Sequence, residues 1–175
     1  MDTDPAELYE RSWQGERLGP AEYPPNSDLV DLTFAECDIV GVLAEKSRLE
    51  RVSVTQSRLR GITWVGGVIR DVTLEQVMGE DVSFRFSSLR GVTIRDAQLP
   101  GVDFTNVEFE NVRFERCLLQ RAVFDHAKVK SLRIEQCDLA GATGVLALRG
   151  ASMNFDDVMS LAPSLAREAG ITIEG

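Results

Sequence analysis

The 175-residue sequence predicts an all-β solenoid of square cross-section that carries short helical caps at its N- and C-termini. From Phe34 to Leu139, 21 of the 22 residues taken five apart are apolar, and the register never slips. A second set, two residues before each of these centres, is small or aliphatic, and the other three residues of each pentad are mostly polar. Neither the 3.6-residue period of a helix nor the 2.0-residue period of a strand gives this pattern. The chain must therefore bend at every pentad, so that four pentads form one turn of roughly 20 residues.

The corners of this square coil are predicted independently by turn chemistry. The two residues after each centre form the middle of a β-turn, and a type II turn needs a positive φ at the second of them. Glycine and asparagine adopt that conformation most readily. They occupy this second position at Gly41, Gly61, Gly66, Gly91, Gly101, Asn106, Asn111 and Gly141.

Residues 20 apart along the chain are expected to stack in columns inside the solenoid. One column reads Ala44, Trp64, Phe84, Phe104 and Phe124, so the smallest centre lies beside the largest, as close packing requires. Gly79 is the one centre that is not apolar, and we expect Met78 to fill the resulting gap. The three cysteines, Cys37, Cys117 and Cys137, share another inward column and are expected to be buried free thiols.

Several pentads resemble the pentapeptide-repeat family, whose consensus is a small residue, Asp or Asn, Leu or Phe, and two variable residues. The best matches are Cys37-Asp38-Ile39-Val40-Gly41, Val102-Asp103-Phe104-Thr105-Asn106 and Cys137-Asp138-Leu139-Ala140-Gly141. The resemblance covers residues 27–142 and implies a right-handed quadrilateral β-helix of about five to six coils. From residue 33 to residue 142 the sequence departs from the family pattern, because Asp fills the second slot only in these three pentads.

The two ends are predicted to cap the solenoid, whose terminal coils would otherwise expose their core. Residues 1–26 form an N-terminal cap segment, with a short helix from Asp4-Pro5-Ala6-Glu7 to about Trp13. Residues 143–175 form a helical cap with two helices, Phe155 to Leu161, capped by Asn154, and Ser164 to Ala169. The side chains expected to lie on the last coil are Phe155, Val158, Met159, Leu161 and Leu165. The family resemblance implies that such helices also form a homodimer interface.

Charge bears on function through its distribution. The formal net charge is −9, yet residues 33–141 carry sixteen acids and fifteen bases, and the excess of acid lies toward the two ends. The resemblance implies, as an alternative function, a DNA-mimicking modulator of DNA gyrase or topoisomerase of the quinolone-resistance type. A mimic needs a dense acidic face, since duplex DNA carries one negative charge per ~1.7 Å, and the nearly neutral repeats lack one. The sequence has no basic patch interleaved with aromatic residues, so it does not predict direct nucleic-acid binding.

The sequence contains no arrangement that predicts catalysis, a cofactor or a metal. Its single histidine, His126, lies beside Asp125 without a nucleophile nearby, and its glycines are regularly spaced corners with no phosphate-binding loop among them. No apolar stretch reaches the ~18 residues of a membrane span. The acidic N-terminus and the odd cysteine count predict a cytoplasmic protein.

The function predicted from these features is that of a non-enzymatic scaffold for protein–protein interaction, with a partner of unknown identity. The wall that bears Leu43, Val65, Phe86 and Val123 at outward positions is poorer in charge than the others and is the candidate partner patch. The C-terminal helices are the second candidate surface, through homodimerisation.

Overall fold

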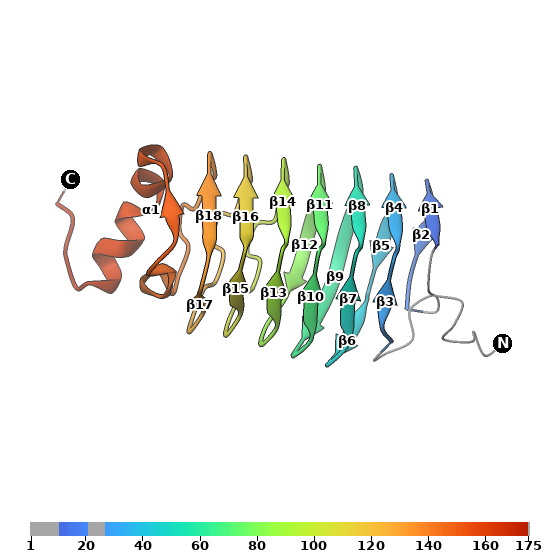
Figure 1. Cartoon of the computed structure of the whole chain (residues 1–175). Coiled ribbons are helices and arrows are strands. Elements are labelled where there is room, and N and C mark those ends of the chain that lie inside the picture. Colours follow the sequence, from blue (N-terminus) through green and yellow to red (C-terminus); the bar gives the residue numbers. More distant parts are fainter. Residues whose placement is uncertain (1–10, 21–26, 175) are drawn as a thin grey trace.

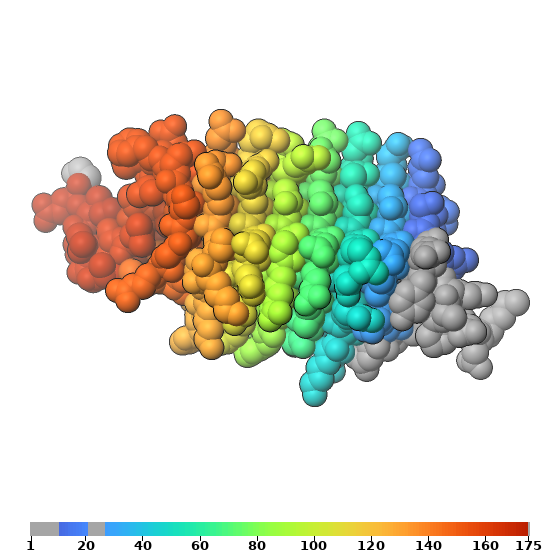
Figure 2. Space-filling model, in the orientation of Figure 1, coloured from blue at the N-terminus to red at the C-terminus, as the bar shows by residue number. Residues whose placement is uncertain are grey.

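The computed structural model describes residues 11–20 and 27–174, and they form a parallel β-solenoid of about seven turns that ends in one C-terminal α-helix (Figure 1). Successive turns lie side by side as parallel ridges along the rod (Figure 2). The predicted solenoid is confirmed. Its length slightly exceeds the expected five to six coils, because the segment before residue 27 also contributes strands.

Two walls of the solenoid are regular parallel sheets. Wall 1 has six strands in the order β17-β15-β13-β10-β7-β3, and wall 2 has eight in the order β1-β4-β8-β11-β14-β16-β18-β19. The strands of wall 1 are β3 (Leu29–Val30), β7 (Arg48–Glu50), β10 (Val68–Arg70), β13 (Ser88–Arg90), β15 (Glu108–Glu110) and β17 (Lys128–Val129). The strands of wall 2 are β1 (Ser12–Gln14), β4 (Thr33–Ala35), β8 (Ser53–Thr55), β11 (Thr73–Glu75), β14 (Thr93–Arg95), β16 (Val112–Glu115), β18 (Leu132–Glu135) and β19 (Ser152–Met153).

Walls 3 and 4 share one sheet in the N-terminal half, because β9 and β12 run around the corner between them. Toward the C-terminus both walls continue as single bridges, Gln98 to Leu118 on wall 3 and Asp103 to Val123 on wall 4. The strands of these walls are β2 (Arg17–Leu18), β5 (Asp38–Val40), β6 (Leu43–Glu45), β9 (Arg58–Val65) and β12 (Met78–Ser83).

Every strand pair between residues 29 and 135 joins residues 20 apart, as in Ile69 with Leu89 and Leu74 with Ile94. Inward side chains of neighbouring coils therefore stack directly on one another. Of the centres from 34 to 139, all are buried except Leu49 and Val129, which are half-buried. The two inward positions per pentad read from the sequence thus form the core.

The predicted corners are confirmed, and they extend beyond glycine and asparagine. Every corner residue from Asp31 to Gly141 has a positive φ except Ser131. Many are Asp, Gln, Glu or Arg, residues for which this conformation costs on the order of 1 kcal/mol. Their backbone amides are held by the next coil, as in Asp31 N–H donating to the Glu50 carbonyl at 3.0 Å. These ladder hydrogen bonds offset the local strain.

Packing differs between the two halves of the core. In the C-terminal half, the Phe104 ring stacks between Phe84 and Phe124, with centroid distances of 5.8 and 5.5 Å. Aliphatic centres dominate the N-terminal half, where an apolar cavity of about 80 Å³ lies between coils. The expected stacking of Ala44 against Trp64 is confirmed by their strand register.

The expectation that Met78 fills the space at Gly79 is wrong. Met78 is 50% exposed, and Gly79 is buried. A Cβ on Gly79 would lie 2.4 Å from Leu99 Cδ2 and 2.9 Å from Val82 Cγ2, so these neighbours already occupy the space. The strand keeps its register here, which leaves Met78 on the outer face.

The N-terminal segment differs from the expectation where the structure describes it. Trp13 lies in β1, which pairs with β4, so the predicted helix does not reach this residue; Asp4 to Glu7 lie outside the described residues. The Trp13 ring stacks on Phe34 with centroids 4.7 Å apart and nearly parallel planes. The terminal coil thus covers its apolar end with an aromatic ring.

The C-terminus has one α-helix, α1 (Phe155–Glu168), where two were expected, preceded by a short 3₁₀ helix, η2 (Val145–Leu148). Asn154 caps α1 as predicted, accepting from Asp157 N–H at 2.9 Å. Pro163 lies inside the helix and lacks the amide that would bond the Met159 carbonyl. Because Met159 is exposed, water can satisfy that carbonyl, and the buried residues on both sides of the proline hold the helix together.

Polar side chains of α1 complete the last coil of the solenoid. The buried carboxylate of Asp157 accepts from the backbone amides of Cys137 at 2.6 Å and Gln136 at 3.1 Å. Ser160 Oγ accepts from Leu139 N–H at 3.2 Å, and Glu168 accepts from the amides of Val145 and Leu146. The helix therefore supplies acceptors that a further coil would otherwise supply.

Candidate partner-binding surfaces

The four residues of the predicted partner patch do not form one continuous apolar surface. Leu43 and Val123 lie in the same outward column of wall 4, separated by Thr63, Ser83 and Asp103. Val65 lies in the other outward column. Phe86 is at the corner between walls 4 and 1, one coil beyond Val65. The structure therefore brings Val65 and Phe86 together, while Leu43, which is 50% exposed, lies apart from Val123.

Phe86 has an unusual combination of conformation and exposure. Its φ is 58°, and it is the one apolar side chain among the described non-glycine residues with a positive φ. Its ring is 54% exposed, and the guanidinium of Arg85 lies 5.5 Å from the ring centroid. A bulky residue in this backbone region is disfavoured, and exposed apolar area adds no burial to offset the strain.

A hollow of about 390 Å³ opens beside this ring, at the start of wall 1. It is lined on one coil by Gly66, Gly67 and Val68, of which Gly66 is exposed and has no side chain. Three coils contribute to the rim, which carries both charged and polar groups. Besides these glycines and Val68, the lining residues are Phe86, Ser87, Ser88, Arg90, Asn106, Glu108, His126 and Lys128.

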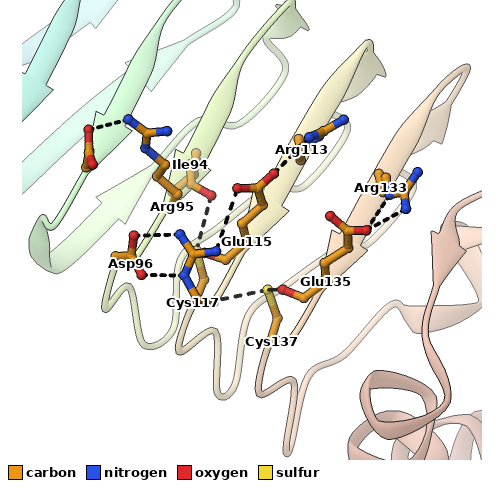
Figure 3. Close-up of polar contacts among 11 residues, drawn as sticks. Ile94, Arg95, Asp96, Arg113, Glu115, Cys117, Arg133, Glu135 and Cys137 are labelled. Atoms are coloured by element: carbon orange, nitrogen blue, oxygen red, sulfur yellow. Dashed lines mark hydrogen bonds and ion pairs between the residues drawn. The ribbon is translucent and has the colours of Figure 1, made fainter.

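Many charged residues of the rod form ion pairs with a residue of a neighbouring coil. Arg116 binds Asp96 with two hydrogen bonds of 2.7 and 2.8 Å (Figure 3). Arg51 binds Asp31 in the same way, and Arg95 binds Glu75 at 2.7 Å. Each bidentate pair joins residues 20 apart and so favours the stacking register.

These pairs act on the acids that they contain. Hydrogen bonds from Arg51, Arg116 and Lys130 hold the pKa values of Asp31, Asp96 and Glu108 below their usual range. The carboxylates remain charged at neutral pH, and each has its countercharge on the adjacent coil. At these positions the surface therefore presents carboxylates whose charge is balanced by a neighbouring base.

The cysteines are free and buried, as expected. Cys117 N–H donates to Cys137 Sγ at 3.4 Å, and both thiols donate to backbone carbonyls (Figure 3). The contact with Cys117 and burial raise the pKa of the Cys137 thiol. The same contact lowers the pKa of the Cys117 thiol, and all three cysteine side chains fill space in the core.

The C-terminal residues predicted to cap the solenoid or to form a dimer divide into two groups. Leu161 is buried and Leu165 packs against the core, which is the capping role. Phe155, Val158 and Met159 are 76%, 40% and 54% exposed. Val158 lines an apolar groove of about 710 Å³ between η2, β19 and α1.

His126 lies on an exposed corner and lines the hollow beside Phe86. Within residues 11–20 and 27–174, no group of three His, Cys, Asp or Glu side chains could hold a metal ion. Over the same residues, no helix has the length and apolar character needed to span a membrane.

Comparison with known proteins identifies the repeat. Residues 103–141 match the family model "Pentapeptide repeats" in eight copies, and the same five-residue register continues through the strands on the N-terminal side. Residues 103–141 are therefore pentapeptide repeats.

Solved structures similar to this chain include three of QnrB1, a plasmid-mediated fluoroquinolone resistance protein. A trypsin-treated variant is 15% identical over 94% of this chain and 100% of that chain, with a TM-score of 0.49. A second treated variant is 13% identical over 99% and 96% of the two chains, with a TM-score of 0.27. The full-length form is 10% identical over 90% and 98%, with a TM-score of 0.22. No curated protein matches the sequence.

The sequence indicated Phe86 as a candidate contact but did not predict the hollow beside it. The hollow draws residues from four successive coils, each 20 positions from the next, so no local motif marks it. One feature of the sequence could have indicated it. Gly66-Gly67 precedes Phe86 by one coil, so residues without side chains lie next to the Phe86 ring.

Proposed function

We propose that this chain is a non-enzymatic pentapeptide-repeat scaffold that binds another protein through its outer surface. The supporting observation is that Phe86 is exposed, has a positive φ and lies beside an open hollow on the surface of the rod. Proteins retain strained residues at functional sites when the surrounding structure holds them. Rigid ladders of parallel strands suit a binding surface, because little conformational entropy is lost when the partner docks.

The test is photo-crosslinking in cells. A photoreactive phenylalanine analogue replaces Phe86 in one strain, Thr73 on wall 2 in a second and Leu118 on wall 3 in a third. The proposal expects one specific protein adduct, obtained at position 86 and absent from the two control positions. Equal adducts at all three positions, or none at any of them, would count against a binding surface at this corner.

The free side of α1 is proposed as a self-association surface. Phe155 and Met159 lie one helical turn apart and are more than half exposed, as expected for an unpaired helix face. Sedimentation of the purified protein is expected to give a dimer, and of the Phe155→Ser, Met159→Ser variant a monomer. A wild-type monomer at high micromolar concentration would contradict this proposal.

Modulation of DNA gyrase stays a prediction from the family resemblance, and the paired acids of the rod do not favour it. A supercoiling assay with and without a quinolone tests it directly. The scaffold proposal places the protein in the cytoplasm, since its three thiols are free.

A further inference from the structure

We infer that the hollow beside Phe86 binds an acidic protein segment, with an apolar ring seated against Phe86 and a carboxylate about three residues away bound by Lys128. The inference rests on the proposed scaffold function and names the chemistry of its partner. The hollow combines a ring, an exposed glycine corner and an unpaired cation, and each of these selects one part of the segment.

The apolar part is selected by the side of the hollow that Gly66, Val68 and Phe86 line. Gly66 is exposed and leaves its corner without a side chain, and a Cβ there would meet nothing closer than Lys46 Cγ at 3.8 Å. Val68 is 37% exposed on the same coil, and Phe86 of the next coil lines the same hollow. A partner's aromatic or large aliphatic side chain can thus lie against Phe86 and close to the glycine backbone. Aromatic pairs contribute about 0.5–1.5 kcal/mol beyond the area that they bury.

The charge of the partner is selected by Lys128. Among the described residues no carboxylate lies within ion-pair distance of its ammonium group. Its strand neighbour Glu108 is already bound by Lys130 at 2.7 Å and lies 4.0 Å from Arg90. Three cations therefore surround Glu108 and Glu110, and one positive charge is left over beside the hollow. A carboxylate of the partner would supply the missing countercharge.

The geometry of the coils sets the spacing of the two groups. Phe86 and Lys128 are two coils apart, which corresponds to about 10 Å along the rod at ~4.8 Å per coil. An extended chain rises ~3.3 Å per residue. A segment that runs along the rod therefore carries its carboxylate about three residues from its ring.

The test uses hexapeptide probes and the full-length protein labelled with ¹⁵N. The first probe is acetyl-Ser-Trp-Ser-Ser-Glu-Ser-amide; the second has Lys in place of Glu, and the third has Ala in place of Trp. The inference expects the first probe to shift the amide resonances of Gly66, Gly67 and Lys128 at millimolar concentration. The second and third probes are expected to bind at least about threefold more weakly. This is the loss in affinity expected when one exposed charge pair or one aromatic contact is removed.

Matched variants assign the effect to the two side chains. Phe86→Asn places at this corner the residue that the chain has one coil later, Asn106, so the fold is preserved while the ring is lost. Lys128→Glu reverses the charge at the hollow, and Arg58→Glu makes the same change on wall 3, where Arg58 also has no paired acid among the described residues. Binding is expected to weaken about fivefold or more with the first two variants and to stay unchanged with the third.

Several results would overturn the inference. These are equal binding of the Glu and Lys probes, shifts confined to other walls, no shifts at all, or tighter binding of a single-stranded thymidine hexanucleotide than of the first probe. Crosslinking at position 86 to a partner, combined with any of these results, would leave the scaffold proposal standing and reject only the acidic segment.

Discussion

Trp64 and Gly67 fit together as a pair in the core. A Cβ on Gly67 would lie 2.5 Å from Trp64 Nε1 and 2.2 Å from the Ser47 carbonyl oxygen. The sequence predicted that Ala44 makes room for the indole of Trp64. In the structure Gly67, three residues after Trp64, makes room for it as well. The bulkiest side chain of the core therefore depends on two of the smallest residues.

Gly67→Ala is expected to lower the free energy of unfolding by about 1–3 kcal/mol, because the added methyl overpacks this site. Alanine itself suits the same inward slot elsewhere, as Ala97 and Ala122 demonstrate. Urea unfolding measures the change. In a Trp64→Phe background the cost should shrink without vanishing, since the Ser47 carbonyl remains close. An equal cost in both backgrounds would show that the indole plays no part.

The cavity in the N-terminal half predicts opposite effects for one substitution at two equivalent positions. Val52 lines the cavity, whereas Val112, in the same slot of wall 2 three coils later, lies in the tightly packed half. Val52→Ile should stabilise by about 0.5–1 kcal/mol by filling space, and Val112→Ile should destabilise by about 1 kcal/mol or more. Thermal unfolding compares them. Equal signs for the two variants would contradict the difference in packing.

The buried carboxylate of α1 predicts a large effect from a position that looks like an ordinary helix N-terminus. Asp157→Ala leaves the amides of Cys137 and Gln136 without their acceptor, at an expected cost of about 1–3 kcal/mol. Asp156 shares the first turn and is exposed, so Asp156→Ala should cost only a few tenths of a kcal/mol. Urea unfolding measures both costs. Similar costs for the two variants would show that Asp157 stabilises the protein only through its favourable interaction with the helix dipole.

The paired acids predict a loss of stability in acid. The pKa values of Asp31, Asp96 and Glu108 are lower in the folded state than their usual values, so the folded state binds these protons less readily. Their contribution is present above the unfolded pKa, near 4, and is lost as the pH falls through the lowered folded values. The thermal midpoint should therefore fall as the pH drops below about 4, and Asp96→Asn should flatten that fall. A midpoint independent of pH between 7 and 3 would show that the pairs add no stability.

The five-residue period was enough to predict the solenoid, its inward columns and its corners, because each coil contacts only its neighbours and one local rule repeats. The period carries no information where the repeat ends. Trp13 continues wall 2 as a strand although its neighbours break the pattern, and α1 continues through Pro163 where two helices were expected. The hollow beside Phe86 could not be predicted from the sequence for a related reason. It forms only when residues of successive coils lie side by side.

The affinity of the purified protein for the partner that crosslinks at position 86 tests the proposed binding corner most directly. We expect Phe86→Asn to weaken this binding at least about tenfold, as for a central aromatic contact. The thermal midpoint of the variant should be equal to or above that of the wild type. Unchanged affinity with this variant would contradict the claim that this corner is where the rod binds.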